Sequence, residues 1–124
     1  MRTLLLLASL VVALLCLTPL RVSAQPLIVI DAGHGGTDPG AVGCSLQEAD
    51  VVLDVATRLR TFLEGSGIRV ALTRDTDVFV GLTARATFAN GMGADGFVSI
   101  HSNANAGTPA TGTETWISNS AGAR

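Results

Sequence analysis

A chain of 124 residues with a formal net charge of −2 and no lysine is long enough for one domain, but it has too few basic side chains to neutralise many phosphates. Nucleic-acid binding is therefore disfavoured as a function. The chain has two cysteines, and Cys16 lies in an N-terminal segment that is expected to be removed, which leaves Cys44 alone. This excludes an intramolecular disulfide and a Cys-x-x-Cys metal pair, so the fold must depend on a hydrophobic core.

The first segment has the pattern of a secretory signal peptide. Arg2 precedes an apolar run over residues 4–17, and Val22-Ser23-Ala24 fits the small-residue rule for a cleavage site. The run is short for a membrane-spanning helix, which needs about 20 apolar residues, so an uncleaved anchor is the less favoured alternative. We expect residues 1–24 to be removed and residues 25–124 to be exported, to the periplasm or to the extracellular cell wall, with no stable membrane span remaining.

Strand and helix patterns then alternate. Leu27–Asp31 is an apolar run typical of a buried strand, and residues 32–44 form a glycine-rich loop. Ser45-Leu46-Gln47-Glu48 fits a capping box, which predicts a helix beginning at Ser45 and ending near residues 65–67. The apolar positions of this helix recur at helical spacing and predict one buried face: Val52, Val55, Ala56, Leu59, Phe62 and Leu63.

The second half of the chain continues the alternation. It contains a predicted strand over 68–73, a short helix over 82–90, a strand over 97–101 and a last strand over 112–118 that is antiparallel or at an edge. This order predicts an α/β fold with a mostly parallel, twisted sheet and helices packed on it. Because no helix follows the last strand, we expect the domain to be truncated at its C-terminus and the far side of the sheet to lack cover.

Three side chains that can bind a metal are expected at one edge of this sheet. His34 follows the first strand, His101 ends the third, and Glu48 lies in the first turn of the helix that leaves the same loop. The carboxyl ends of parallel strands share an edge, so all three can converge there. Two imidazoles and one carboxylate are a ligand set of catalytic zinc sites, in which water holds the fourth position.

Each of the three also has an alternative explanation that the residues alone leave open. His34 could be a surface histidine, and His101 could be a hydrogen-bonded histidine of the core. Glu48 could be the second partner of the capping box. A carboxylate that holds a metal is less free to close the cap, so the two explanations of Glu48 compete.

Five segments in series resemble the zinc-dependent N-acetylmuramoyl-L-alanine amidases of cell-wall hydrolysis, the type 3 amidases. The segments are IVIDAGHGGTDPGAVG, EADVVLDVATRLRTFLEGSGIRVALTRDTD, LTARATFAN, ADGFVSIHSNA and GTETW. The resemblance implies that residues 25–124 are the N-terminal part of the catalytic domain and that His34, Glu48 and His101 bind Zn²⁺. It also implies that the substrate is the amide between N-acetylmuramic acid and L-alanine in peptidoglycan.

The resemblance further implies a catalytic glutamate on a later strand, beyond GTETW and another helix. That glutamate is expected downstream of Arg124, and its role is transferred to neither Glu64 nor Glu114. No catalytic residue is therefore assigned within the chain. The alternative function is a non-catalytic peptidoglycan-binding or regulatory module that lacks this base.

Other polar residues near the expected site have weaker claims. Arg74, Asp77 and Arg85 are expected to form ion pairs that hold a loop and the second helix, and Asp31 to orient a zinc-bound imidazole. The His-Gly-Gly run at residues 34–36 also resembles the oxyanion loop of esterases. No Gly-x-Ser-x-Gly nucleophile segment accompanies it, so an esterase is disfavoured.

Overall fold

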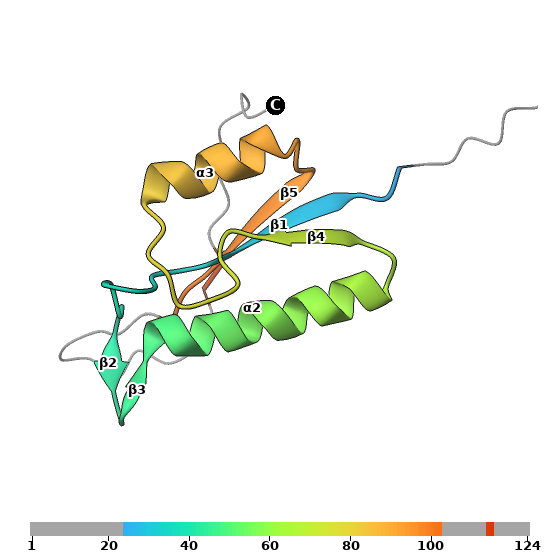
Figure 1. Cartoon of the computed structure of the whole chain (residues 1–124). Coiled ribbons are helices and arrows are strands. Elements are labelled where there is room, and N and C mark those ends of the chain that lie inside the picture. The colour runs from blue at the N-terminus through green and yellow to red at the C-terminus, as the bar shows by residue number, and fades with distance from the viewer. Residues whose placement is uncertain (1–23, 103–113, 116–124) are drawn as a thin grey trace, which may run out of the picture.

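The computed structural model describes residues 24–102 and 114–115 (Figure 1). In chain order the elements are β1 (Leu27–Ala32), β2 (Val42–Gly43), β3 (Leu46–Gln47), α2 (Glu48–Gly65), β4 (Arg69–Leu72), α3 (Leu82–Gly91) and β5 (Gly96–Ile100). The first three predicted strands and both predicted helices are therefore confirmed, with shifts of a few residues at their ends. The predicted signal segment lies outside the described residues except for Ala24. The predicted strand over 112–118 lies outside them except for Glu114 and Thr115, which are exposed and in neither helix nor strand.

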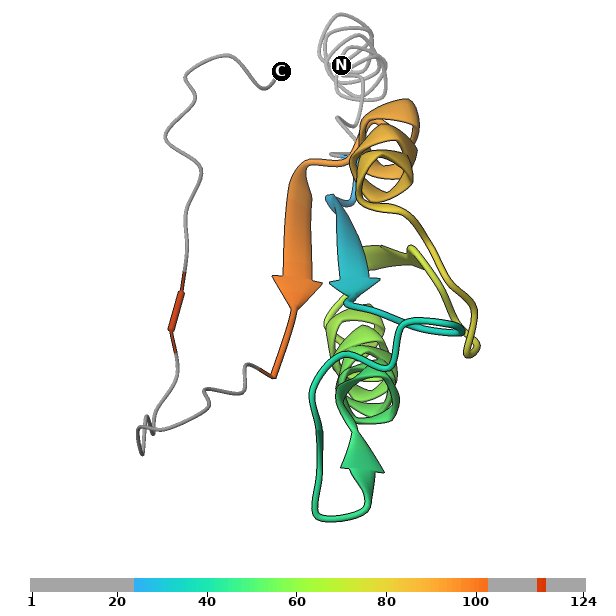
Figure 2. The ribbon, with the colours of Figure 1, turned by 90° about the vertical axis from the view of Figure 1, so that its left-hand side faces the viewer.

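The three longer strands form a parallel sheet in the order β4-β1-β5. In the central strand, Val29 pairs with Ala71 of β4 on one side and with Phe97 of β5 on the other. All but one of the residues of β1 are buried, which explains why its sequence is a continuous apolar run and not an alternating one. Figure 2 shows β1 and β5 pointing the same way, so that their C-terminal ends lie at one edge.

The two helices lie on opposite faces of the sheet (Figure 1). The chain passes from β1 to β4 through α2 and then returns across β1 to β5 through α3. Right-handed crossovers that reverse direction in this way place their helices on opposite faces. The predicted α/β layering is therefore confirmed.

The hydrophobic core lies between β1 and α2. Ile30 and Ala32 of the strand pack with Val52 and Ala56 of the helix, and all four are buried. Partly buried apolar side chains surround this group: Ile28, Leu53, Leu59, Leu63, Val70, Leu72 and Ile100. The base of the site is thus a strand and a helix held together by tight apolar contact.

The predicted buried face of α2 is too wide. Val55 and Phe62 were expected in the core, but they are 42% and 71% exposed. At 3.6 residues per turn these two positions fall about 60° and 80° to one side of Val52, whereas Ala56 falls to the other side, toward the sheet. Helical spacing in the sequence identifies the whole apolar stripe of α2. Which side of that stripe is buried depends on how the helix packs against the sheet.

Several apolar side chains of α3 and β5 are exposed among the described residues. They are Leu82, Phe88, Phe97 and Val98. Within the same residues, neither helix combines the length and the apolar character needed to cross a bilayer.

Candidate metal centre

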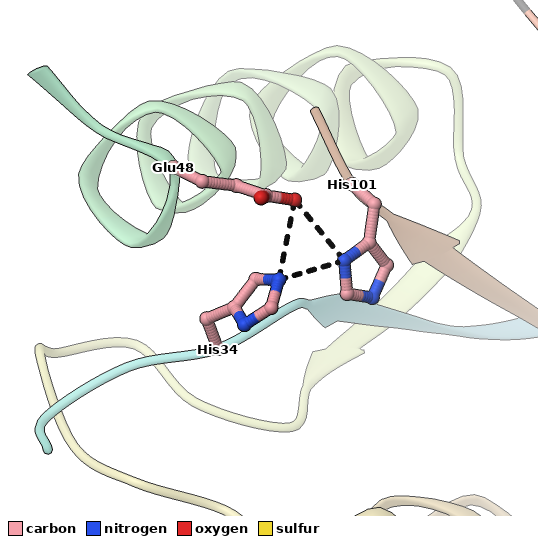
Figure 3. A group of neighbouring side chains, drawn as sticks. All are labelled: His34, Glu48 and His101. Carbon is pink, nitrogen blue, oxygen red and sulfur yellow. Dashed lines mark hydrogen bonds and ion pairs between the residues drawn. The ribbon is translucent and has the colours of Figure 1, made fainter. Parts of the chain in front are cut away.

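Three side chains meet at the edge of the sheet where β1 and β5 end (Figure 3). His34 comes from the loop after β1, Glu48 is the first residue of α2, and His101 directly follows β5. The Nε2 atom of His34 lies 3.3 Å from Oε1 of Glu48. The Nδ1 atom of His101 lies 3.1 Å from the same oxygen and 3.1 Å from Nε2 of His34. The structure thus brings together the three residues that the sequence analysis selected.

The backbone around His34 turns sharply. His34 has a φ of +59°, a left-handed conformation that is uncommon outside glycine, although histidine adopts it more readily than most residues. Gly35 and Gly36 follow with φ of +120° and +59°. Gly35 and Asp38 then exchange two backbone hydrogen bonds of 2.8 and 3.2 Å, which close the turn. This turn aims the imidazole of His34 away from the strand and toward α2.

Two glycines allow the site to be so compact. A Cβ at Gly33 would collide with the imidazole ring of His101. A Cβ at Gly40 would lie 2.6 Å from Cδ2 of His34 and 2.9 Å from Cβ of Glu48, closer than side-chain carbons approach one another. The glycines of the loop therefore allow backbone to pass directly against the rings and the carboxylate.

His34 has a second carboxylate partner that the sequence analysis missed. Its Nδ1 atom lies 2.9 Å from Oδ2 of Asp38, whose other oxygen accepts a hydrogen bond of 3.1 Å from the N–H of Gly40. The hydrogen bond from His34, together with that from Gly40, lowers the pKa of Asp38 below its ordinary value. The sequence does contain a signal for this contact. In His-Gly-Gly-Thr-Asp the two glycines allow a tight turn, and the aspartate follows the histidine by four residues.

The start of α2 differs from the predicted capping box. The N-cap residue is Gln47, which makes no side-chain cap, and Ser45 instead lies in the turn of the β2–β3 hairpin with a φ of +64°. The hairpin brings loop carbonyls to the helix start, so that the N–H of Glu48 donates to the carbonyl of Ala41. Backbone acceptors thereby satisfy the first helical N–H groups, and a side-chain cap at Ser45 is unnecessary.

The Glu48 carboxylate consequently serves the site and not a cap. Its Oε2 accepts a hydrogen bond of 3.0 Å from the N–H of Ala41, and its Oε1 accepts one of 2.7 Å from the N–H of Ser102. Burial alone would raise the pKa of Glu48, but these two N–H groups, with the nearby His34 and His101, lower it overall. Glu48 is therefore an anchored, ionised carboxylate facing two imidazoles.

This arrangement fits a divalent cation. A carboxylate can only accept, so the contact with Asp38 is a hydrogen bond when the proton of neutral His34 sits on Nδ1, and Nε2 then presents a lone pair to the site. Nε2 faces the Glu48 oxygen and the Nδ1 atom of His101, so three atoms that can each ligate a metal ion converge. Ligands of a tetrahedral zinc ion with bonds of about 2.0–2.1 Å lie about 3.3 Å apart, close to the separations found here.

Asp31 lies beneath the site and does not orient an imidazole, so that prediction is wrong. Its carboxylate accepts hydrogen bonds of 2.5 Å from Thr73, 2.7 Å from Ser99 and 2.7 Å from Arg85. Burial would raise the pKa of Asp31, but these three partners lower it overall. Because side chains alternate along a strand, Asp31 of β1 lies on the α3 face of the sheet, opposite Ile30 and Ala32, which pack on α2.

Arg85 connects the end of β1 to α3. Besides its ion pair of 2.7 Å with Asp31, it donates to the carbonyls of Ala32 at 2.6 Å and of His34 at 2.8 Å. The expected ion pairing of Arg85 is therefore confirmed, and its partner is Asp31. The bond to the carbonyl of His34 also helps to fix the left-handed backbone at that residue.

Arg74 is buried and acts through backbone carbonyls. It donates hydrogen bonds of 2.8 Å to Gly33 and 2.7 Å to Ala49, and so ties the glycine-rich loop to the start of α2. Burial, with the nearby Arg85, lowers its pKa. Asp77 accepts a hydrogen bond of 2.7 Å from the N–H of Gly36. Both residues hold the loop as expected, but through backbone groups and not through the predicted ion pairs.

Comparison with known proteins places these residues in a family context. A family profile described as N-acetylmuramoyl-L-alanine amidase matches residues 28–124. A sporulation-specific N-acetylmuramoyl-L-alanine amidase of Bacillus subtilis is 48% identical over 92 residues, which cover 73% of this chain and 35% of that protein. The amidase AmiC of Neisseria meningitidis is 42% identical over 104 residues, which cover 83% of this chain and 25% of the relative.

Solved structures agree in fold. The amidase AmiC2 of Nostoc punctiforme superposes with a TM-score of 0.67 and 45% identity, over 70% of this chain and 49% of that one. An N-acetylmuramoyl-L-alanine amidase of Clostridium difficile 630 superposes with a TM-score of 0.68 and 35% identity, over 72% of this chain and 50% of that one. The matched region spans a quarter to a third of these two curated relatives and about half of each solved chain.

Proposed function

Because this chain belongs to the N-acetylmuramoyl-L-alanine amidase family, we propose that the protein hydrolyses the amide between N-acetylmuramic acid and L-alanine in peptidoglycan. Residues 25–124 contribute the zinc-binding part of its catalytic domain. The observation that carries the proposal is the convergence of three atoms that can ligate a metal ion, at 3.1–3.3 Å from one another, on His34, Glu48 and His101.

We assign the metal ligands to Nε2 of His34, Oε1 of Glu48 and Nδ1 of His101. Zinc bound there would lower the pKa of water and polarise the carbonyl of the scissile amide. The chain provides a carboxylate that is nearly fully buried and two imidazoles that are partly open to solvent. The site is thus accessible from the side of the imidazoles, where substrate can approach.

Amide hydrolysis also needs a general base, and Glu48 is not suited to that role. Both of its oxygens accept backbone hydrogen bonds, and one of them faces both imidazoles. Glu64 lies near the far end of α2, and Glu114 is exposed. We therefore assign the base to none of the described residues, as the sequence resemblance implies.

The substrate requires the protein to leave the cytoplasm. We propose that residues 1–24 are an export signal, supported by Arg2, the apolar run and the Val-Ser-Ala cleavage pattern. The periplasm and the extracellular cell wall both satisfy this requirement. Amino-terminal sequencing of the exported protein should find Gln25 as its first residue, whereas retention of Met1 in a membrane fraction would contradict the assignment.

The test of activity is digestion of purified peptidoglycan with the protein as the cell makes it. Mass spectrometry should find released stem peptides that begin with a free L-alanine amino group, together with intact glycan strands. A chelator should abolish the release and added zinc should restore it. Binding to peptidoglycan without release would instead support the alternative, a non-catalytic binding or regulatory module.

A further inference from the structure

We propose that Asp38 is a positioning residue, which holds His34 in the one imidazole tautomer that can bind metal and so sets the metal affinity of the site. The proposal rests on the assignment of His34 as a ligand, given above. Asp38 lies outside the ligand set and reaches the metal position only through the ring of His34.

The hydrogen bond itself carries the first step. Oδ2 of Asp38 lies 2.9 Å from Nδ1 of His34, on the side of the ring opposite the atom that faces Glu48. An ionised carboxylate has no proton to donate, so this contact is a hydrogen bond only when Nδ1 carries the hydrogen. In the other neutral tautomer Nε2 would carry it, and that nitrogen could not then bind a metal ion.

The position of Asp38 is also independently fixed. Its N–H and carbonyl form the two backbone hydrogen bonds with Gly35, and its Oδ1 accepts from the N–H of Gly40. Side chain and main chain are therefore both held before a metal arrives. A carboxylate with this much local support can orient a ring, whereas a mobile surface carboxylate could not.

The backbone of His34 makes such support necessary. With a φ of +59°, its side chain leaves a left-handed turn between Gly33 and Gly35, and its ring is partly open to solvent. The carbonyl of His34 is held by Arg85, but this bond fixes only the backbone. Among the described residues, Asp38 makes the hydrogen bond that fixes the far edge of the ring.

The decisive experiment reads the tautomer in the metal-free protein. The chain has two histidines, so two-bond ¹H–¹⁵N spectra of protein labelled at histidine show two imidazoles, and a His101→Gln variant assigns them. At a pH where both rings are neutral, wild-type His34 should show the Nδ1–H pattern. In Asp38→Ala, His34 should move toward the Nε2–H pattern, which predominates in free imidazole side chains.

Zinc affinity, measured by competition with a chromophoric chelator, provides the second readout. Asp38→Ala should weaken binding by about 10–100-fold, the usual cost of losing the partner of a metal-bound histidine. Asp38→Asn keeps the volume and one accepting oxygen, so it should retain the Nδ1–H tautomer and lose less affinity. Asp77→Asn is the matched control, because Asp77 holds the N–H of Gly36 in the same loop without touching His34.

The outcomes separate this inference from the proposed function. An unchanged His34 tautomer in Asp38→Ala, with zinc affinity within threefold of wild type, would overturn the role of Asp38. Equal loss of affinity in Asp38→Asn, Asp38→Ala and Asp77→Asn would also overturn it, since that result describes general loosening of the loop. Failure of the wild-type protein to bind zinc would refute the proposed metal site, and the tautomer spectra would still decide what Asp38 does.

Discussion

The Nδ1 atom of His101 lies 3.1 Å from Oε1 of Glu48, although 53 residues separate them in the chain. Their meeting depends on two structural elements. Strand β5 runs parallel to β1 and ends beside it, and the N–H of Ser102, the next residue after His101, donates directly to the same Glu48 oxygen. The backbone N–H of Ser102 therefore anchors the Glu48 carboxylate, and the end of β5 places the imidazole of His101 beside it.

Glu48→Gln should sharply weaken zinc binding. Glutamine can still accept a backbone hydrogen bond, but it has no negative charge to offset a divalent cation. We expect the zinc dissociation constant to rise by more than about a hundredfold, since even the outer partners of metal ligands account for about 10–100-fold. Chelator competition measures the change. Glu64→Gln, near the other end of the same helix, is the control, and equal effects of the two substitutions would remove Glu48 from the metal site.

Asp31→Asn should destabilise the fold. The substitution leaves the guanidinium of Arg85 buried without its charged partner, and breaking a buried pair in this way costs about 3–5 kcal/mol. Urea unfolding followed by circular dichroism measures the loss. The control is Asp54→Asn, which breaks the exposed pair with Arg58 on α2 and should cost far less, because exposed ion pairs contribute little to stability. Similar losses in the two variants would show that the buried pair has no special structural role.

The same aspartate should make stability depend on pH. The pKa of Asp31 is lower in the folded protein than its ordinary value, so near pH 4 the unfolded chain binds more protons than the folded one. The stability that Asp31 contributes is full above its unfolded pKa of about 3.9 and disappears as the pH falls through the folded pKa. The difference in unfolding free energy between wild type and Asp31→Asn should therefore be constant from about pH 7 to pH 5 and shrink below about pH 4. A difference that stays constant or grows on acidification would contradict this assignment.

Gly40→Ala should damage the site and the fold together. The new Cβ would press on the ring of His34 and on the side chain of Glu48, at a residue whose φ is +65°. We expect weaker zinc binding and a loss of about 1–3 kcal/mol in unfolding free energy. Gly43→Ala is the matched control, because a Cβ at Gly43 has no neighbour within 4 Å. If Gly40→Ala behaves like Gly43→Ala, close packing around the ring is not required.

Most of the fold could be predicted because its signals are local and strong. The continuous apolar run of β1 and the helical spacing of α2 indicate buried parallel strands and crossover helices, and the three candidate ligands then follow from where those elements end. Val55 and Phe62 were misplaced because periodicity defines a stripe, and tertiary packing chooses which of its edges is buried.

The errors at the site have a different physical origin. Ser45 matches a capping box in the sequence. In the structure, the chain around the β2–β3 hairpin supplies backbone acceptors to the first N–H groups of α2, which leaves the Glu48 carboxylate free to face the imidazoles. Asp31 was expected to contact an imidazole, and Asp38 provides that contact. The left-handed turn at His34 decides which carboxylate reaches the ring, and a backbone conformation of that kind is not visible in residue types.

The ligands of the metal can be read by X-ray absorption at the zinc edge of the zinc-loaded protein. We expect two imidazole ligands and otherwise oxygen ligands, at about 2.0–2.2 Å, with no sulfur. Cys44 is an exposed free cysteine in the β2–β3 hairpin and is the competing thiol within the described residues. Loss of one imidazole signal in His34→Ala and in His101→Ala would confirm both assignments. A sulfur ligand at about 2.3 Å, or a spectrum unchanged by either substitution, would refute zinc binding by His34, Glu48 and His101.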